Sequence, residues 1–307
     1  AVDRGLQSKF SKDVNPKNPL PEYPRPQFER EKWMNLNGLW QYAVCAKDAE
    51  CPESFDGRIL VPFPIESSLS GVRRQLDADE ALWYKRRFNI PSHWSEKNIR
   101  LNFGAIDYDA TIFVNNKQIG HHIGGYSSFS YDISDALKKG ENTLMVKVLD
   151  PTDVWKQATG KQRINWENSR TIWYTPCSGI WQTVWLEPVN QKHIQQVHIT
   201  PELDQNLFHF SIALANAEHG DEIIIRLKDG HEIIKTESLP ASTLTKSKIR
   251  IDSPKLWSPD SPFLYGVELV YRSKEKEVDL VKSYTAMRKI SYARDENGYW
   301  RLMLNNK

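Results

Sequence analysis

The composition of the chain sets the first limits on its function. Its 307 residues carry 41 Lys and Arg against 39 Asp and Glu, which gives a formal net charge of +2. Domains usually hold about 100–200 residues, so this length favours two domains. The balanced charge lacks the basic excess of a nucleic-acid-binding protein, and no apolar run approaches the about 18 residues that cross a bilayer. We therefore expect neither nucleic acid nor a membrane as a partner.

Residues 1–30 are rich in proline and precede the first regular pattern. Proline lacks an N–H donor and fixes φ, which disfavours helix and favours an extended conformation. We expect this segment to lie as an arm on the surface of a domain. Its prolines are Pro16, Pro19, Pro21, Pro24 and Pro26.

Short runs of alternating apolar and polar residues follow the arm, separated by polar turns. Runs of this length at regular spacing predict an all-β sandwich or barrel. One short helix is expected at residues 133–138, with Gly140 as its stop signal. The predicted strands include residues 39–44, 83–88, 99–103, 110–114 and 143–148.

Cys45 and Cys51 flank a short polar segment. If that segment is a hairpin loop, the two thiols lie opposite each other and can form a disulfide. Disulfides persist in oxidising compartments, so a bond would place the protein in the periplasm or outside the cell. Otherwise the pair stays reduced, since two ligands are too few for a zinc site. Cys177 is expected as a buried free thiol.

A domain boundary is expected near residues 188–190, where one strand series closes and another begins. About seven strands in about 100 residues are typical of an immunoglobulin-like sandwich. No cysteine pair lies inside this second series, so it would lack the disulfide of antibody domains. Its predicted strands are residues 194–200, 208–213, 222–227, 248–251, 265–271 and 278–286.

The last residues, 288–307, carry the pattern of a β-hairpin. Asn297-Gly298 is a strong tight-turn pair, and the residues after it alternate toward a strand. Asn305-Asn306-Lys307 then reads as a further turn. We expect this stretch to lead into an additional domain of a longer protein.

Six segments along the chain match motifs of one family in order and at sensible spacings. They are 35–42 (NLNGLWQY), 61–67 (VPFPIES), 83–88 (WYKRRF), 113–129 (FVNNKQIG with GGYSSF), 178–186 (SGIWQTVWL) and 256–265 (LWSPDSPFLY). Each segment alone is weak, but together they span almost the whole chain. On these residues the chain resembles family 2 glycoside hydrolases, the group that contains β-galactosidases, β-glucuronidases and β-mannosidases.

The resemblance implies an architecture and an activity. It implies a jelly-roll sugar-binding domain over residues 1–190, an immunoglobulin-like sandwich over residues 191–287, and a lead-in to a (β/α)8 barrel over residues 288–307. Family members hydrolyse β-linked glycosides with retention, using two glutamates at the ends of barrel strands. Because the barrel would lie outside this chain, we assign no catalytic residue and no cofactor, and we expect the chain alone to be inactive.

Two aromatic residues are the best candidates for contact with sugar. Some family members carry an Asp, five residues before a Ser/Ala-Gly-Ile step, that binds the sugar or a cation; here Trp173 occupies that position. Trp cannot ligate a cation, so Trp173 and the adjacent Tyr174 either stack on a sugar ring or fill space. Glu66 and Arg73 flank a loop, where they either contact sugar or form an Arg–carboxylate pair.

Two further sets of residues carry side chains that can ligate metals. His121 and His122 are adjacent, and neighbouring strand residues point to opposite faces, so they converge on one ion only if they lie on an irregular loop. Asp107 and Asp109 alternate and are expected to face the same side. Hard cations want six or more oxygen ligands, which are not identifiable here. We therefore expect no metal site.

Three functions are compatible with these features of the sequence. The first is the noncatalytic N-terminal part of a retaining β-glycosidase, whose partners are carbohydrate and the barrel domain, and which would support a homodimer of the full-length protein. The second is a stand-alone carbohydrate-binding module without hydrolase activity. The third is a structural scaffold of two sandwiches, which the barrel lead-in disfavours. The sequence does not identify the sugar.

Overall fold

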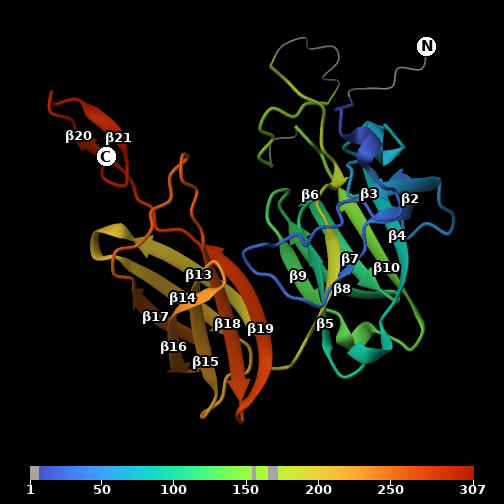
Figure 1. Cartoon of the computed structure of the whole chain (residues 1–307). Helices are drawn as coiled ribbons and strands as arrows, with labels where there is room; N and C mark the ends of the chain where they lie inside the picture. The colour runs from blue at the N-terminus through green and yellow to red at the C-terminus, as the bar shows by residue number, and fades with distance from the viewer. Residues whose placement is uncertain (1–6, 154–156, 165–171) are drawn as a thin grey trace. The chain divides into compact units, whose positions relative to one another are not determined.

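The computed structural model describes residues 7–153, 157–164 and 172–307 of the chain (Figure 1). These residues fold into two compact units. Unit 1 is formed by residues up to Pro24 and by Lys32–Pro188, and unit 2 by Arg25–Glu31 and Val189–Lys307. Both units are built from antiparallel strands, and the helical segments that the structure describes are 3-10 turns of three residues. The predicted all-β fold class is therefore confirmed.

Unit 1 is a sandwich of a six-stranded and a four-stranded antiparallel sheet, with one further strand pair. The six-stranded sheet has the order β3-β2-β4-β10-β7-β8, the four-stranded sheet β1-β12-β5-β9, and the pair is β11-β6. The strands are β1 (Met34–Asn35), β2 (Gly38–Ala46), β3 (Gly57–Val61), β4 (Glu80–Asn89), β5 (Asn98–Phe103), β6 (Ile106–Asp107), β7 (Asp109–Val114), β8 (Lys117–Ile123), β9 (Phe129–Asp132), β10 (Glu141–Leu149), β11 (Gly179–Ile180) and β12 (Val184–Val189).

The core of unit 1 lies between its two sheets. Trp40 of β2 and Tyr84 of β4 come from the larger sheet, while Phe103 of β5 and Leu186 of β12 come from the smaller one; all four are buried. The Trp40 indole N–H donates to the carbonyl of Leu36 at 2.8 Å, which satisfies its polar atom inside the core. Truncating a core aromatic of this kind to Ala costs about 3–5 kcal/mol.

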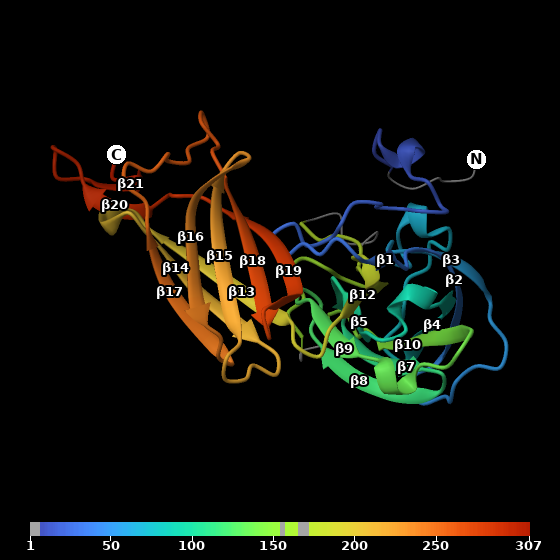
Figure 2. The same cartoon turned by 60° about the horizontal axis from the view of Figure 1, so that its bottom comes forward.

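Unit 2 is a second sandwich, made of a three-stranded sheet β13-β14-β17 and a four-stranded sheet β16-β15-β18-β19. Figure 2 shows the strands of the four-stranded sheet side by side. A separate hairpin, β20-β21, follows them. The strands are β13 (Ile194–Glu202), β14 (Leu207–Leu214), β15 (Glu222–Asp229), β16 (Glu232–Pro240), β17 (Leu244–Arg250), β18 (Tyr265–Ser273), β19 (Lys276–Thr285), β20 (Ile290–Arg294) and β21 (Trp300–Leu304).

Residues Arg25–Glu31 belong to unit 2, although they precede the whole of the first sandwich in sequence. Glu29 forms a backbone bridge with Lys282 of β19. The Arg30 guanidinium donates to the carbonyl of Ile194 at 2.7 Å and to the carboxylate of Asp279 at 2.5 Å. This ion pair is almost fully buried, so breaking it would leave an uncompensated charge. Arg25–Glu31 is therefore held on the second sandwich by specific contacts.

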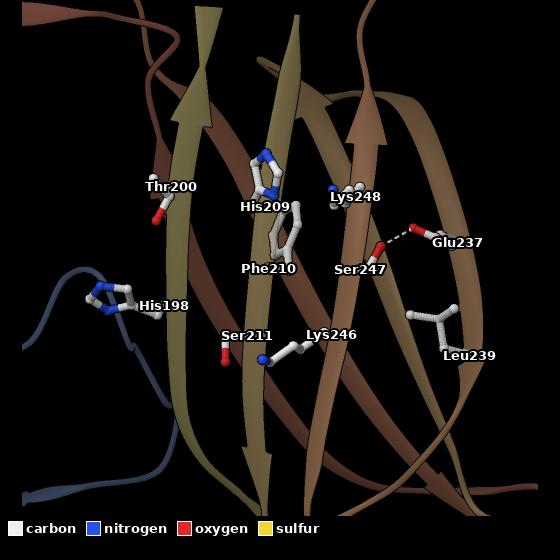
Figure 3. A pocket seen from close by; sticks show the side chains of 10 residues that line it. All are labelled: His198, Thr200, His209, Phe210, Ser211, Glu237, Leu239, Lys246, Ser247 and Lys248. Atoms are coloured by element: carbon white, nitrogen blue, oxygen red, sulfur yellow. Dashed lines mark hydrogen bonds between the residues drawn. The ribbon is translucent and has the colours of Figure 1, made fainter. Parts of the chain in front are cut away.

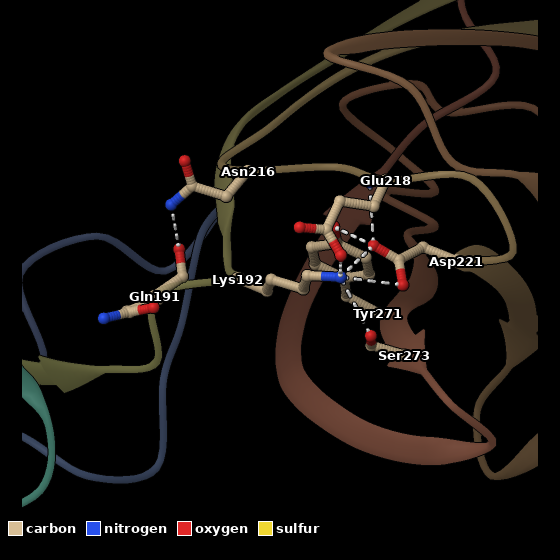
Figure 4. A network of polar contacts seen from close by, with 7 residues as sticks. All are labelled: Gln191, Lys192, Asn216, Glu218, Asp221, Tyr271 and Ser273. Atoms are coloured by element: carbon tan, nitrogen blue, oxygen red, sulfur yellow. Dashed lines mark hydrogen bonds and ion pairs between the residues drawn. The ribbon is translucent and has the colours of Figure 1, made fainter.

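A network around Lys192 fixes the beginning of unit 2 (Figure 4). The Lys192 ammonium donates to Asp221 at 2.8 Å, to Glu218 at 2.8 Å and to Ser273 at 3.0 Å. The hydroxyl of Tyr271 donates to the same Asp221 carboxylate at 3.0 Å. Burial alone would raise the pKa of Asp221, but the hydrogen bonds from Lys192, Ser273 and Tyr271 outweigh it and hold that pKa well below its usual value.

A helix and an edge strand are among the details that differ from the sequence predictions. Residues 133–138 form no helix beyond the 3-10 turn Ser134–Ala136. Residues Glu232–Pro240, which the sequence did not mark as a strand, form β16 at the edge of the four-stranded sheet. Most of its side chains are exposed, so the run lacks the apolar alternation by which strands are recognised.

Candidate functional site

The predicted aromatic pair lies in the segment that precedes β11. Trp173 is half-buried, and Tyr174 is 63% exposed. The backbone of Tyr174 pairs with the segment 161–163, donating to Lys161 at 2.8 Å and accepting from Arg163 at 3.2 Å. The guanidinium of Arg163 lies 5.2 Å from the Trp173 ring centre, and the ammonium of Lys161 lies 5.9 Å from that of Tyr174. Each ring is thus oriented by a cation over one face.

Gln162 joins this aromatic segment to the rest of unit 1. Its side-chain oxygen accepts from the backbone N–H of Cys177 at 2.6 Å, and its nitrogen donates to Asp107 of β6 at 3.3 Å. Burial, and then the negative charge of Asp150, raises the pKa of Asp107 to about 6. Asp107 is therefore a buried structural carboxylate, and its amide partner fixes where Trp173 and Tyr174 lie.

A second aromatic pair adjoins Asp107, and the sequence analysis did not single it out. The Trp181 indole N–H donates to the carbonyl of Gly125 at 2.7 Å. Tyr126, which is 66% exposed, meets the Trp181 ring edge-to-face at 5.9 Å between centroids. A Cβ on Gly125 would clash with the Asp107 carboxylate, so this close approach requires glycine. Both rings lie within family motifs quoted above. Membership of those motifs is the feature of the sequence that could have identified them as site residues.

Glu66 contacts Ser178, which follows the segment that carries Trp173 and Tyr174. Its carboxylate accepts from the backbone N–H of Ser178 at 3.0 Å, and the hydroxyl of Ser178 donates to Asp150 at 2.7 Å. Asp150 also accepts from the backbone of Thr152 at 2.8 Å. Burial raises the pKa of Glu66 to about 7, with a smaller contribution from the charge of Asp150. These contacts give Glu66 a positioning role for the Ser178 turn.

Arg73 lies on the exposed side of the turn that follows Glu66. It adopts a φ of 56°, and its backbone N–H donates to the hydroxyl of Ser70 at 3.5 Å. Asn and Gly occupy such left-handed positions more readily than Arg. The contact of Glu66 or Arg73 with sugar stays a prediction.

The three cysteines are free in this structure. The sulfur of Cys45 lies 4.0 Å from the carbonyl of Ala81, and that of Cys51 lies 4.0 Å from the sulfur of Met145. Burial raises the pKa of Cys45, against the opposing charge of Lys147. The predicted Cys45–Cys51 bond is therefore not formed here, and its formation under oxidising conditions stays a prediction.

The histidines and aspartates weighed as metal ligands are engaged in separate contacts. His121 contacts the carboxylate of Asp109 at 2.6 Å, and His122 stacks on Phe129 at 3.9 Å between centroids. Asp107 and Asp109 belong to β6 and β7 of different sheets, so the expectation that they share a face was wrong. Within the described residues, no group of three or more His, Cys, Asp or Glu side chains could hold a metal ion.

This end of unit 1 presents exposed rings with hydrogen-bonding groups and cations beside them. The two carboxyl groups with raised pKa values accept structural hydrogen bonds. Glu66 accepts from the backbone N–H of Ser178, and Asp107 accepts from the side chain of Gln162. None of the helices in the described part of the chain is long and apolar enough to cross a membrane.

The comparisons with known proteins agree with this description. Residues 58–187 match the model for the sugar binding domain of glycosyl hydrolases family 2, and residues 192–288 match a second model of glycosyl hydrolases family 2. A β-galactosidase of Thermoanaerobacter pseudethanolicus is 25% identical over 71% of this chain and 29% of its own length. A putative β-glucuronidase of Formosa agariphila is 28% identical over 87% of this chain and 26% of its own length.

Solved structures show the same fold. A β-glucuronidase from Ruminococcus gnavus, in complex with D-glucuronic acid, superposes with a TM-score of 0.69 at 20% identity, over 93% of this chain and 50% of that one. The β-glucuronidase of Bacteroides uniformis superposes with a TM-score of 0.66 at 24% identity, over 90% of this chain and 34% of that one. The chain thus spans less than a third of the curated relatives described above. On its two matched domains, the chain belongs to family 2 of the glycosyl hydrolases.

Proposed function

We propose that this chain is the N-terminal, noncatalytic portion of a retaining β-glycosidase. In this proposal unit 1 contributes sugar-contacting loops, and unit 2 connects them to a catalytic barrel in the same polypeptide. The family membership and the names of the relatives support a glycoside as the substrate class. The matched relatives include both galactosidases and glucuronidases, so the proposal does not commit to one sugar.

The observation that carries the proposal is the exposed apolar face of the β20-β21 hairpin. Tyr292 pairs with Leu302 across this hairpin, and Arg294 pairs with Trp300. Tyr292 is 72% exposed and Leu302 is 87% exposed. A two-stranded hairpin is marginal alone, and a contiguous apolar face indicates an interaction partner. A following catalytic domain is the partner that the family membership supports.

Retaining hydrolysis explains why this portion would be inactive by itself. It needs two carboxyl groups about 5–5.5 Å apart at the scissile bond, one as nucleophile and one as acid/base. Glu66 and Asp107, the carboxyls near the exposed rings, instead hold Ser178 and Gln162. The chain would therefore bind and position sugar for carboxylates supplied elsewhere.

The test is an assay of the 307-residue chain with aryl β-galactosides, β-glucuronides and β-mannosides. We expect no release of the aryl group above that of a buffer blank. Turnover that survives further purification and a change of expression host would contradict the noncatalytic assignment.

A carbohydrate-binding module is the second candidate function, and the rings of Trp173, Tyr174, Tyr126 and Trp181 favour it. We would titrate neutral and uronic oligosaccharides into the chain and follow the intrinsic Trp fluorescence. Binding at millimolar or lower concentration that is lost in Trp173→Ala would support this module. Absence of binding throughout the panel would count against it and leave the first proposal standing.

A further inference from the structure

The outer face of the three-stranded sheet in unit 2 carries an ordered set of polar and basic side chains. Two cross-strand rows run over β13, β14 and β17. His198 pairs with Ser211, which pairs with Lys246. Thr200 pairs with His209, which pairs with Lys248. Each row therefore contains one imidazole, one hydroxyl and one ammonium group, because alternate residues of a strand point to the same face.

These rows line a solvent-open cavity of about 590 Å³, shown in Figure 3. Neighbouring strands lie about 4.8 Å apart and alternate residues about 6.7 Å apart, so the side chains form a regular grid. Lys246, from the edge strand β17, reaches toward Ser211 on the central strand in Figure 3. Glu237 and Leu239 of β16 complete the lining.

Lys246 and Lys248 are not paired with the carboxylates of this face. Both lysines are exposed and form no ion pair with any residue of the described ranges. Glu202 contacts His209, and Glu237 accepts a hydrogen bond from the hydroxyl of Ser247. The two ammonium groups therefore have no carboxylate partner within the described residues and are open to an anionic ligand.

Protection of an edge strand explains only part of this pattern. Lysines on an exposed edge discourage pairing with another chain, and β17 is such an edge. That role requires lysines on β17 only. It does not require an imidazole and a hydroxyl on β13 and β14 in each of the two rows. The combination across three strands is one that recognises anionic groups.

We propose that this face of unit 2 binds an anionic polysaccharide, a sugar chain with carboxylate or sulfate groups. Lys246 and Lys248 supply the charge, while Ser211, Thr200 and the two histidines supply hydrogen bonds. Single-stranded nucleic acid fits less well, since its binding sites stack bases on exposed rings, and Phe210, the one ring beside the histidines, is 2% exposed. The inference concerns unit 2 and does not require the hydrolytic function proposed above.

The test is an equilibrium binding measurement with the full 307-residue chain. The probes are polygalacturonate for carboxylates, dextran sulfate for sulfates, unmodified dextran as the neutral control and single-stranded DNA as the competing polyanion. We expect one of the two acidic polysaccharides to bind at low ionic strength, to weaken as salt is added, and to bind more tightly than DNA. Dextran should not bind.

Charge reversal then locates the site. Lys246→Glu with Lys248→Glu should weaken binding at least about tenfold, because two attractive charges become repulsive, whereas the double Arg variant at these positions should retain it. The matched control is Lys139→Glu with Lys276→Glu, two exposed lysines outside the face. An equal loss in the control, tighter binding of DNA, or no binding of either acidic polysaccharide would each overturn the proposal. Since the readout is binding, it stands apart from any result on hydrolysis.

Discussion

Gly125 shows how one residue determines the geometry of the aromatic loops. Its carbonyl accepts from Trp181, while its Cα lies against Asp107 with no room for a side chain. Asp107 in turn holds Gln162. The positions of the two loops that carry the rings therefore depend on the absence of one methyl group.

Substituting Gly125 by Ala tests that dependence. The added methyl must displace the buried Asp107 carboxylate, and overpacking of this kind costs about 1–3 kcal/mol. We expect the free energy of unfolding in urea to fall by that amount and the near-UV signal of Trp181 to change. Gly266→Ala is the control, because its Cβ would make only an ordinary contact at 3.4 Å with the flexible Lys228. Equal stability of the two variants would contradict the close packing.

Glu66 makes a prediction about pH. Burial raises its folded pKa to about 7, above the usual 4.5, so the folded state binds this proton more tightly than the unfolded state. The stability that Glu66 contributes is present below about pH 4.5 and is lost as the pH rises through 7. Asp107, with a folded pKa of about 6, acts in the same direction at slightly lower pH.

Glu66→Gln isolates this contribution. We expect the unfolding free energy of the wild type, relative to the variant, to decrease by about 1–3 kcal/mol between pH 4.5 and pH 8. Urea titrations at several pH values measure it. Glu53→Gln, at an exposed position, should show no such trend. A difference that grows with pH would mean that the carboxylate is stabilised in its charged form.

At the scale of elements, the Lys192 network stabilises the start of unit 2 beside its first strand, β13. Asp221 carries the charge, and its folded pKa is held below the usual value. Its contribution is therefore present above about pH 4, and it is lost as the pH falls through the folded pKa.

Tyr271→Phe removes one hydrogen bond from this network. The buried hydroxyl donates to a charged carboxylate at 3.0 Å, and such bonds contribute about 1.5–3 kcal/mol. We expect a loss of that size in the unfolding free energy at pH 7 and a similar loss at pH 3, because the lowered folded pKa of Asp221 keeps its carboxylate charged there. Tyr292→Phe, on the exposed hairpin, is the matched control. An unchanged stability of Tyr271→Phe at pH 7 would show that the hydroxyl is replaceable by water.

The strands that the sequence predicted best are those with one buried face. β7, for example, alternates strictly between buried and half-buried residues, and this is the pattern from which a strand is recognised. β16 was missed because an edge strand with mostly exposed side chains has no such pattern. The placement of Arg25–Glu31 in unit 2 depends on the buried Arg30–Asp279 pair, which joins residues far apart in sequence.

The site was predicted less completely than the fold. Trp173 was predicted because it lies five residues before the Ser178-Gly179-Ile180 step, and Tyr174 because it is adjacent to Trp173. Tyr126 and Trp181 were not, because their importance comes from the Gly125 contact and from exposure, which require the folded chain. The partner of Glu66 could not be foreseen either, because Ser178 lies 112 residues away in sequence.

At the scale of the whole molecule, the exposed hairpin face predicts a difference between this chain and a longer one. Tyr292→Lys with Leu302→Lys should leave the unfolding of the 307-residue chain unchanged and reduce its self-association. In a protein that includes the following domain, the same variant should lower stability, because charges would enter an apolar interface. Light scattering and thermal unfolding measure the two effects. Loss of stability in the shorter chain would show that the face already packs there.

The central claim is that this chain binds sugar for a catalytic domain that it does not contain. The most direct test reads the source gene beyond the codon for Lys307 and assays the longer product beside this chain on aryl β-glycosides. We predict an open frame of about 250 residues or more, the usual barrel length, and hydrolysis by the longer product alone. A stop codon soon after Lys307, or hydrolysis by the 307-residue chain, would contradict the account.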